Sequence, residues 1–302
     1  MAVVYPDYYG EFRCIADKCR HNCCIGWEID IDGDTLDFYR SVKGDFGKRL
    51  LENISEDAPH FILGDNERCP FLNHKNLCDI ITELGEGKLC SICRDHPRFR
   101  VELPGRTEVG LGLCCEEAAR IVITKKNKTS LTCAPETDDE IILLRDEITA
   151  LLQNREKSLE NRLCDVFSLF GESIPVFSAD EWRERLLALE RLDDGWGERI
   201  ADLRGEDGLE EFERYIAGRE TEYEQFLVYI IYRHLAAAPD WDEAYRRVCF
   251  AAFCYFLIYN LGALHYKKHG KFTTADQIEL VREFSAEIEY SDENLYAVID
   301  SF

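Results

Sequence analysis

Cysteines are the residues of this chain whose type and spacing point most directly to chemistry. The sequence holds 14 of them in 302 residues, and eleven precede residue 136. A thiolate is a soft ligand that selects zinc, iron–sulfur clusters or copper(I), so thiols that gather in groups indicate metal binding. Ten of the eleven form three groups along the chain: Cys14, Cys19, Cys23 and Cys24; Cys69, Cys78, Cys90 and Cys93; and the adjacent pair Cys114 and Cys115.

The spacing within these groups bears on the choice of metal. A tetrahedral zinc site usually uses two CxxC-like turns, and only Cys90 and Cys93 have that spacing. Iron–sulfur ligands are spaced more variably, and adjacent thiols such as Cys23 and Cys24 can serve two irons of one cluster. The pattern therefore favours an iron–sulfur cluster, of the [4Fe-4S] type, over zinc. Buried thiols without metal are the alternative.

The start of the chain indicates a reducing compartment for these thiols. Residues 1–8 carry no basic segment and no apolar run of signal-peptide length. We therefore expect a cytoplasmic protein in which clustered cysteines hold metal rather than disulfides. The most apolar stretch, residues 248–264, is shorter than the roughly 20 residues that a membrane span needs, so it predicts a buried helix and no membrane contact.

Charge narrows the class of partner. Lys and Arg number 36 against 59 Asp and Glu, a net charge of -23. Binding to a phosphate backbone needs clustered cations, so we expect no nucleic-acid partner. Most of the excess lies in residues 136–302, which contain 18 cations and 37 anions. This acidic part of the chain can attract lysine-bearing surfaces, although acidic side chains more often form only a solvent-exposed face.

The elements that must position the cysteines differ between the two halves of the chain. Composition shifts in the polar stretch 125–137, which predicts a cysteine-rich metal-binding domain over residues 1–130 and an acidic helical domain over residues 131–302. The first half is irregular, with a short strand predicted at residues 27–32 and a helix at 116–123. The fold class is therefore mainly α: an irregular N-terminal domain with short strands, packed on a C-terminal helical bundle.

Periodicity and capping patterns place the helices of the second half. Residues 223–235 and 245–264 are apolar nearly all round, so we expect them to be the central helices of the bundle. Ser178, Thr274 and Ser291 are the predicted N-caps of three further helices. The remaining predicted helix has its apolar residues at three- and four-residue spacing, at Ile141, Leu144, Ile148, Leu151 and Leu152.

Eight short stretches carry a likeness to known sequences: Tyr5-Pro6-Asp7-Tyr8-Tyr9, Phe12-Arg13-Cys14, Cys23-Cys24-Ile25-Gly26-Trp27, Cys69-Pro70-Phe71-Leu72-Asn73, Leu77-Cys78-Asp79-Ile80, Cys93-Arg94-Asp95-His96-Pro97-Arg98, Cys115-Glu116-Glu117-Ala118-Ala119-Arg120 and Glu287-Ile288-Glu289-Tyr290-Ser291-Asp292-Glu293-Asn294-Leu295. Over nearly the whole chain they resemble the flagellin lysine-N-methylase (FliB-like) family. The cysteine blocks alone also recur in a wider class of proteins with a CxxCxxCC-type zinc- or iron-chelating motif.

This resemblance implies a bacterial enzyme that transfers methyl groups from S-adenosylmethionine to lysine side chains of flagellin, or of another lysine-bearing protein. The chain departs from the family pattern at Cys114, Glu116 and Tyr290, where we expect Ser, Pro and His. Cys90 and Cys114 are additional to the family's cysteines or replace them, and four others, Cys133, Cys164, Cys249 and Cys254, are predicted to be inert core residues. The cysteines that match the family, and that we predict as metal ligands, are Cys14, Cys19, Cys23, Cys24, Cys69, Cys78, Cys93 and Cys115.

Catalytic and cofactor residues are indicated more weakly. Tyr290, Glu289 and Asp292 could supply a proton acceptor for the lysine, or they could simply form the acidic start of a helix. Arg94 and Arg98 could hold a cofactor carboxylate or donate to cluster sulfurs, or could form local ion pairs. Because no dinucleotide-type glycine fingerprint is present, a common methyltransferase sheet is not expected. The alternative function is a non-enzymatic metal-chelating or redox-sensing module that docks a partner protein.

Overall fold

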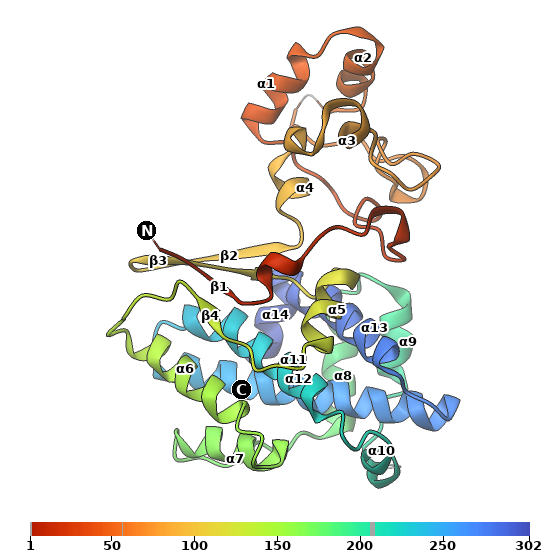
Figure 1. Cartoon of the computed structure of the whole chain (residues 1–302). Helices are drawn as coiled ribbons and strands as arrows, with labels where there is room; N and C mark the ends of the chain where they lie inside the picture. Colours follow the sequence, from red (N-terminus) through yellow and green to blue (C-terminus); the bar gives the residue numbers. More distant parts are fainter. Residues whose placement is uncertain (1, 56, 206–208) are drawn as a thin grey trace. The chain divides into compact units, whose positions relative to one another are not determined.

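The computed structural model of the chain describes residues 2–55, 57–205 and 209–302. It is mainly helical, with one small mixed sheet (Figure 1), as the sequence predicts. The chain forms two compact units, Arg13–Phe99 and the combination of Met1–Phe12 with Arg100–Phe302. These boundaries differ from the compositional one at 125–137, because the first strand pairs with a strand that follows residue 105.

The Arg13–Phe99 unit is built from short helices joined by irregular chain. They are α1 (Gly33–Ser41), α2 (Gly44–Glu52), α3 (Asp79–Leu84) and α4 (Ser91–Asp95), with single turns at Ala16–Lys18, Asp65–Glu67 and Glu86–Lys88. Its core packs Tyr39, Phe61 and Phe71 together with the buried thiols of Cys69 and Cys90. Cysteine side chains therefore form part of the small apolar core of this unit.

The strand predicted at residues 27–32 is wrong. Only isolated bridges occur there, such as the antiparallel bridge between Asp30 and His60. The Phe61 amide donates to Ile29 and the Ile31 amide donates to Pro59, at 3.0 and 2.7 Å. Two apolar residues of the alternating pattern, Ile29 and Ile31, are buried and the third, Trp27, is exposed; the partner segment pairs over too few residues for a ladder.

The sheet of the second unit has the strand order β2-β3-β1-β4. β1 (Ala2–Pro6) runs parallel to β3 (Arg106–Leu111), with Val3 opposite Thr107, and antiparallel to the short β4 (Leu131–Thr132). β2 covers Arg98–Leu103. Because β3 is buried along its whole length and ends at Leu111, the segment Gly112–Cys115 leaves the sheet inside the protein and leads into α5 (Glu116–Thr124).

Helices make up the rest of this unit, and α11 (Glu220–His234) and α12 (Trp241–His269) are buried on nearly every side. This confirms their prediction as the central helices. By length and composition α12 is apolar enough to cross a membrane, but 72% of its most apolar window is buried inside the protein. The other helices are α6 (Glu140–Leu152), α7 (Leu159–Ser168), α8 (Ala179–Leu187), α9 (Asp194–Ala201), α10 (Leu209–Tyr215), α13 (Thr274–Phe284) and α14 (Asp292–Ile299), with a π-turn over Ser285–Glu289.

Capping residues begin these helices largely where the sequence predicts. The side chains of Ser178 and Ser291 accept from the amides of Glu181 and Asn294 at 3.4 and 3.2 Å. The predicted capping box at Thr274 is displaced by one residue, because Thr273 is the N-cap and exchanges hydrogen bonds with Asp276. The helix that begins there buries Ile278, Val281 and Phe284 on its inward face.

Candidate metal centre and active site

Six thiols gather in the Arg13–Phe99 unit, although they come from stretches of chain up to about seventy residues apart. Cys23 is hydrogen-bonded to Cys24, and Cys90 to Cys93. Cys24 lies close enough to Cys69 and Cys78 to interact electrostatically, and Cys93 does so with Cys24 and Cys69. The Cys69 amide also donates to the Cys24 carbonyl at 2.9 Å. The fold of this unit thus places the second cysteine group beside the end of the first.

Within each hydrogen-bonded pair the two thiols differ in acidity. The hydrogen bond from Cys24, reinforced by His96, lowers the pKa of Cys23 to about 4. The hydrogen bond from Cys93 likewise lowers the pKa of Cys90. The same hydrogen bonds together with burial raise the pKa of the partners Cys24 and Cys93. Burial, with a smaller contribution from Cys78 and Cys90, raises the pKa of Cys69 to about 11.

The thiols are near one another without forming a finished coordination sphere. In residues 2–55, 57–205 and 209–302, no three His, Cys, Asp or Glu side chains converge as a set that could hold a metal ion. Nor does a disulfide join any two cysteines in this described part of the chain. The donor chemistry suits a soft metal, but a metal would have to draw the sulfurs closer together.

The other predicted ligands have different surroundings. The exposed Cys14 accepts from the Ala16 amide at 3.4 Å, and the Cys19 thiol donates to the His21 carbonyl at 3.3 Å. Cys114 and Cys115 belong to the other unit. Five of the eight predicted ligands are therefore brought together, with Cys90 as a sixth.

The four cysteines predicted to be inert core residues divide into two pairs. Cys249 and Cys254 are buried as predicted, but Cys133 and Cys164 are exposed. Cys133 follows a two-residue strand, and Cys164 lies on the outer face of α7.

The two predicted cofactor arginines lie on either side of His96 in the sequence. Arg94 is exposed and pairs with its neighbour Asp95 at 3.2 Å, and it donates to the Ser91 hydroxyl at 3.3 Å. Arg98 begins β2. The residue of this segment that reaches a sulfur is His96, through its hydrogen bond to Cys23.

A second candidate site surrounds Glu289, which is fully buried at the end of the π-turn. His234 Nε2 lies 2.8 Å from one carboxylate oxygen, and the Tyr229 hydroxyl donates to the same carboxylate at 3.1 Å. Arg233 Nε lies 3.5 Å away and completes an ion pair. Burial raises the pKa of Glu289, but Arg233 and His234 outweigh burial and hold it below its ordinary value. We refer to Tyr229, Arg233, His234, Glu289 and Tyr290 as the Glu289 cluster.

Tyr290 joins this cluster to the Cys114 segment. Its hydroxyl is hydrogen-bonded to the Cys114 thiol, and a side chain on Gly112 would overlap that hydroxyl. Burial raises the pKa of Tyr290 well above its ordinary value, so the side chain is a phenol that donates to sulfur. Arg233 covers its ring at 4.8 Å from the centroid. Tyr290, Arg233 and Cys115 are only partly buried, so this edge of the cluster reaches solvent.

Sequence reasoning found Glu289 and Tyr290 but missed Tyr229, Arg233 and His234. The available signal was the presence of ionisable residues at one end of an otherwise apolar stretch, 223–235. The third catalytic candidate, Asp292, is exposed in the first turn of α14. The structure thus brings two of the three candidates into one cluster and leaves Asp292 at the surface as the start of a helix.

A match to a known protein family covers the part of the chain that contains the Glu289 cluster. Residues 176–302 match the FliB lysine N-methylase C-terminal domain. The chain is 24% identical over 176 residues to the lysine-N-methylases of Salmonella typhimurium and Salmonella choleraesuis, which covers 54% of this chain and 41% of each relative. It is 23% identical over 143 residues to the flagellar biosynthetic protein FliU of Salmonella muenchen, 43% of this chain and 82% of that protein.

The match therefore spans less than half the length of the two lysine-N-methylases. No solved structure matches the chain. The matched domain contains α11, the π-turn and α14, and so includes every member of the Glu289 cluster. Residues 176–302 are similar to the C-terminal domain of FliB lysine N-methylases, and this similarity supports the FliB-like resemblance for the part of the chain that holds Glu289 and Tyr290.

Proposed function

We propose that this chain is a protein-lysine N-methyltransferase similar to flagellin lysine methylases, acting on flagellin or another lysine-bearing protein in the cytoplasm. The observation that carries the proposal is the match of residues 176–302 to the FliB lysine N-methylase C-terminal domain. The likeness to lysine-N-methylases and to a flagellar biosynthetic protein agrees with it. Both the acceptor lysine and the methyl donor, S-adenosylmethionine, are part of the proposal.

The proposed reaction has a simple balance. The lone pair of a deprotonated lysine amine forms a nitrogen–carbon bond as the sulfur–methyl bond of the sulfonium breaks, and the sulfonium becomes a neutral thioether. The methylated amine is first formed as a protonated ammonium group, and it then releases one proton to an acceptor. Such a transfer needs an unprotonated amine that is held in line with the methyl group.

The Glu289 cluster supplies a rigid support for this geometry. Glu289 is buried and already shared between Arg233, His234 and Tyr229, so it is a positioning residue rather than the proton acceptor. Tyr290 is a phenol, so it can orient a neighbouring group by donating a hydrogen bond. Asp292 remains our candidate for proton uptake, because it is an exposed carboxylate two residues from Tyr290.

A metal centre in the Arg13–Phe99 unit is the second part of the proposal. Four of the six gathered thiols would hold an iron–sulfur cluster, with [4Fe-4S] as the preferred type and zinc as the alternative; the six are Cys23, Cys24, Cys69, Cys78, Cys90 and Cys93. A bound centre would cross-link segments that are far apart in sequence. It would thereby support a unit whose apolar core is small.

Incubation of anaerobically purified protein with methyl-labelled S-adenosylmethionine and flagellin tests the proposed activity. Label on lysine side chains supports it. The gathering of six thiols favours one competitor, a metal-chelating or redox-sensing module. An intact brown chromophore without label transfer would favour that module, and a colourless protein with stoichiometric zinc would favour a zinc-stabilised adaptor.

A further inference from the structure

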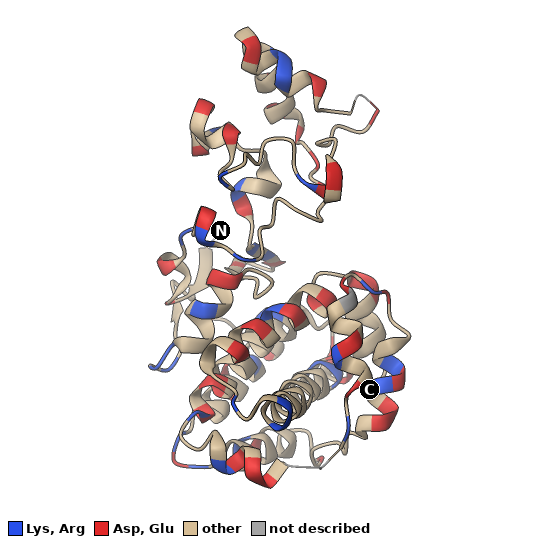
Figure 2. Ribbon diagram, turned by 90° about the vertical axis from the view of Figure 1, so that its right-hand side faces the viewer, with Lys and Arg blue, Asp and Glu red and all other residues tan. Residues whose placement is uncertain are grey.

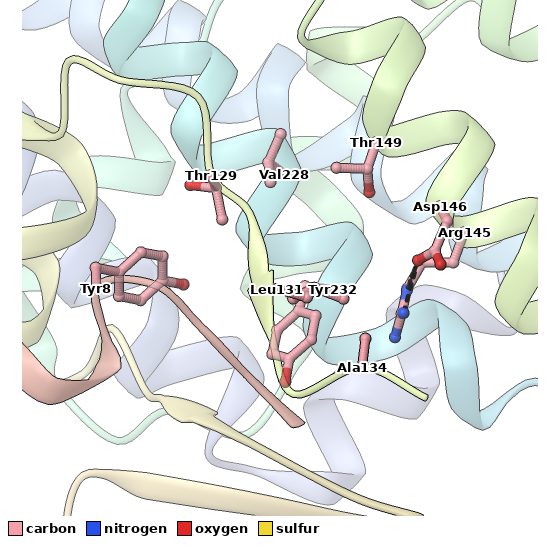
Figure 3. A pocket seen from close by; sticks show the side chains of 9 residues that line it. All are labelled: Tyr8, Thr129, Leu131, Ala134, Arg145, Asp146, Thr149, Val228 and Tyr232. Carbon is pink, nitrogen blue, oxygen red and sulfur yellow. Dashed lines mark hydrogen bonds and ion pairs between the residues drawn. The ribbon is translucent and has the colours of Figure 1, made fainter. Parts of the chain in front are cut away.

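A cavity of about 230 Å³ opens on the helical unit between the sheet, α6 and α11. Figure 3 shows Arg145 and Asp146 side by side on α6, with Tyr8 on the other side of the view. The cavity does not touch the Glu289 cluster: Val228 and Tyr232 line it from α11, whereas Tyr229 and Arg233 leave that helix about 100° further round. No residue that lines the cavity has a role in the proposed reaction.

The walls suit a long aliphatic chain. Tyr8 and Tyr232 are almost completely buried and contribute aromatic surface, while Leu131 and Val228 contribute aliphatic surface. Two threonine hydroxyls, of Thr129 and Thr149, also line the space. Apolar walls with a few polar groups are typical of small-ligand sites, and aromatic faces attract cations that are placed over them.

The polar end of the cavity favours a cation over an anion. Arg145 is buried and already serves two carboxylates: Nη1 donates to Glu108 at 2.5 Å and Nη2 donates to Asp146 at 2.7 Å. Its Nε also donates to Oδ1 of Asp146, at 3.1 Å. Both Arg145 contacts therefore use one oxygen of Asp146. The second oxygen, Oδ2, belongs to a side chain that is 47% exposed and can accept a hydrogen bond from a ligand.

Acidic residues outnumber basic ones in the sequence around the mouth of the cavity. Residues 129–144 include four acidic residues and no Lys or Arg, although Lys126 and Lys128 precede this stretch and Arg145 follows it. Three of the acidic residues, Glu136, Asp138 and Glu140, are exposed, and they follow Ala134, which lines the cavity. Figure 2 shows both acidic and basic residues on the helices of this unit. A cation that approaches this face is drawn inward by charge and then meets Asp146.

We propose that this cavity binds an alkylammonium group, the side chain of a lysine in the polypeptide substrate, with its methylenes along Leu131 and Val228 and its nitrogen at Asp146 Oδ2. The assignment of the ligand to the protein substrate rests on the proposed function. The site is a docking site and not the place of methyl transfer. It holds a second lysine of the substrate while another lysine reacts.

Saturation-transfer NMR with Nα-acetyl-lysine methylamide as the probe tests this site on the full chain. The neutral norleucine analogue is the matched ligand control, because it has the same methylenes without the charge. Asp146→Asn removes the proposed partner. Glu147→Gln is the matched protein control, because it makes the same charge change on the next, exposed residue of α6. Ala134→Trp narrows the cavity at an exposed position without touching an ion pair.

We expect the lysine probe to bind and the norleucine probe not to bind. Asp146→Asn should weaken binding of the lysine probe about tenfold, because one charge-assisted hydrogen bond is lost. Glu147→Gln should leave its binding unchanged. Ala134→Trp should weaken binding without changing the circular dichroism spectrum. Equal binding of both probes, or equal effects of the Asp146 and Glu147 variants, would overturn the proposal. So would binding of cadaverine without binding of a lysine-containing flagellin peptide, since the ligand would then be a free amine.

Methyl-transfer assays on the same variants separate this inference from the proposed function. If both hold, Asp146→Asn raises KM for flagellin and leaves kcat unchanged. If the protein transfers methyl groups but binds the lysine probe equally in all variants, only the docking site is refuted. If it binds the probe as predicted but transfers no methyl group, the alkylammonium site stands and the proposed function fails.

Discussion

Replacement of Glu289 by Gln should destabilise the helical unit far more than loss of one hydrogen bond would. The variant keeps the size of the side chain and an acceptor oxygen for Tyr229, but it removes the negative charge that Arg233 and His234 face. Glu289 is fully buried and Arg233 is only 12% exposed. Removal of one partner from a buried ion pair costs about 3 to 5 kcal/mol. Because Glu289→Gln keeps the hydrogen bond from Tyr229, we expect the free energy of unfolding to fall by about 3 kcal/mol, near the lower end of this range.

Chemical denaturation followed by circular dichroism measures this loss as a shift of the helical transition. The matched control is Glu181→Gln, because Glu181 pairs with Arg185 on the surface, where the two side chains are 57% and 43% exposed. An exposed pair contributes about 0 to 1 kcal/mol, so the control should barely move the transition. Equal shifts for both variants would show that the Glu289 cluster is not held by charge.

The pH dependence of the same experiment has a defined sign. The folded-state pKa of Glu289 lies below its ordinary value, so its contribution to stability is fully present above the unfolded pKa of about 4.3. It is lost as the pH falls through the folded pKa. The difference in stability between the wild type and Glu289→Gln should therefore shrink below about pH 4.3. A constant difference across that range would contradict an ionised carboxylate.

Three other outcomes are expected. Gly112→Ala should lower methyl transfer at least tenfold, because the new Cβ would displace the Tyr290 hydroxyl, whereas Gly87→Ala, which meets no atom within 4 Å, should not. Cys23→Ser should reduce bound metal in elemental analysis and Cys164→Ser, an exposed control, should not; equal losses would reject the ligand assignment. Asp32 caps α1 and accepts from the Ser91 amide at 2.8 Å, so Asp32→Ala should cost about 1 to 2 kcal/mol. Because hydrogen bonds lower the pKa of Asp32 to about 2, acid titration should abolish that difference between pH 4 and pH 2.

Local patterns in the sequence were sufficient for most of the helical unit. Ser178 and Ser291 cap the predicted helices, and the two most apolar stretches became the central helices α11 and α12. These features depend on residues within one or two turns, which a sequence displays directly. The short helices α1 and α2 were not predicted, because each has nine residues and only two buried ones, too few for a clear periodicity.

The candidate sites were predictable only in part, because they depend on contacts between distant residues. The cysteine groups were recognisable from residue type, yet the proximity of Cys24 to Cys69 and Cys78 is a result of the fold. Glu289 and Tyr290 were found through family resemblance. Their partners His234 and Arg233 lie more than fifty residues earlier in the chain, and no local pattern connects them. The cavity beside Asp146 has no sequence signature, since four separate segments line it.

Mass spectrometry of flagellin after incubation with S-adenosylmethionine tests the central claim most directly. With wild-type protein, fragment spectra should place added methyl groups on lysine side chains, and the Gly112→Ala variant should leave far fewer. Unmodified lysines after incubation with folded, metal-loaded protein would contradict the assignment of this chain as a lysine methyltransferase.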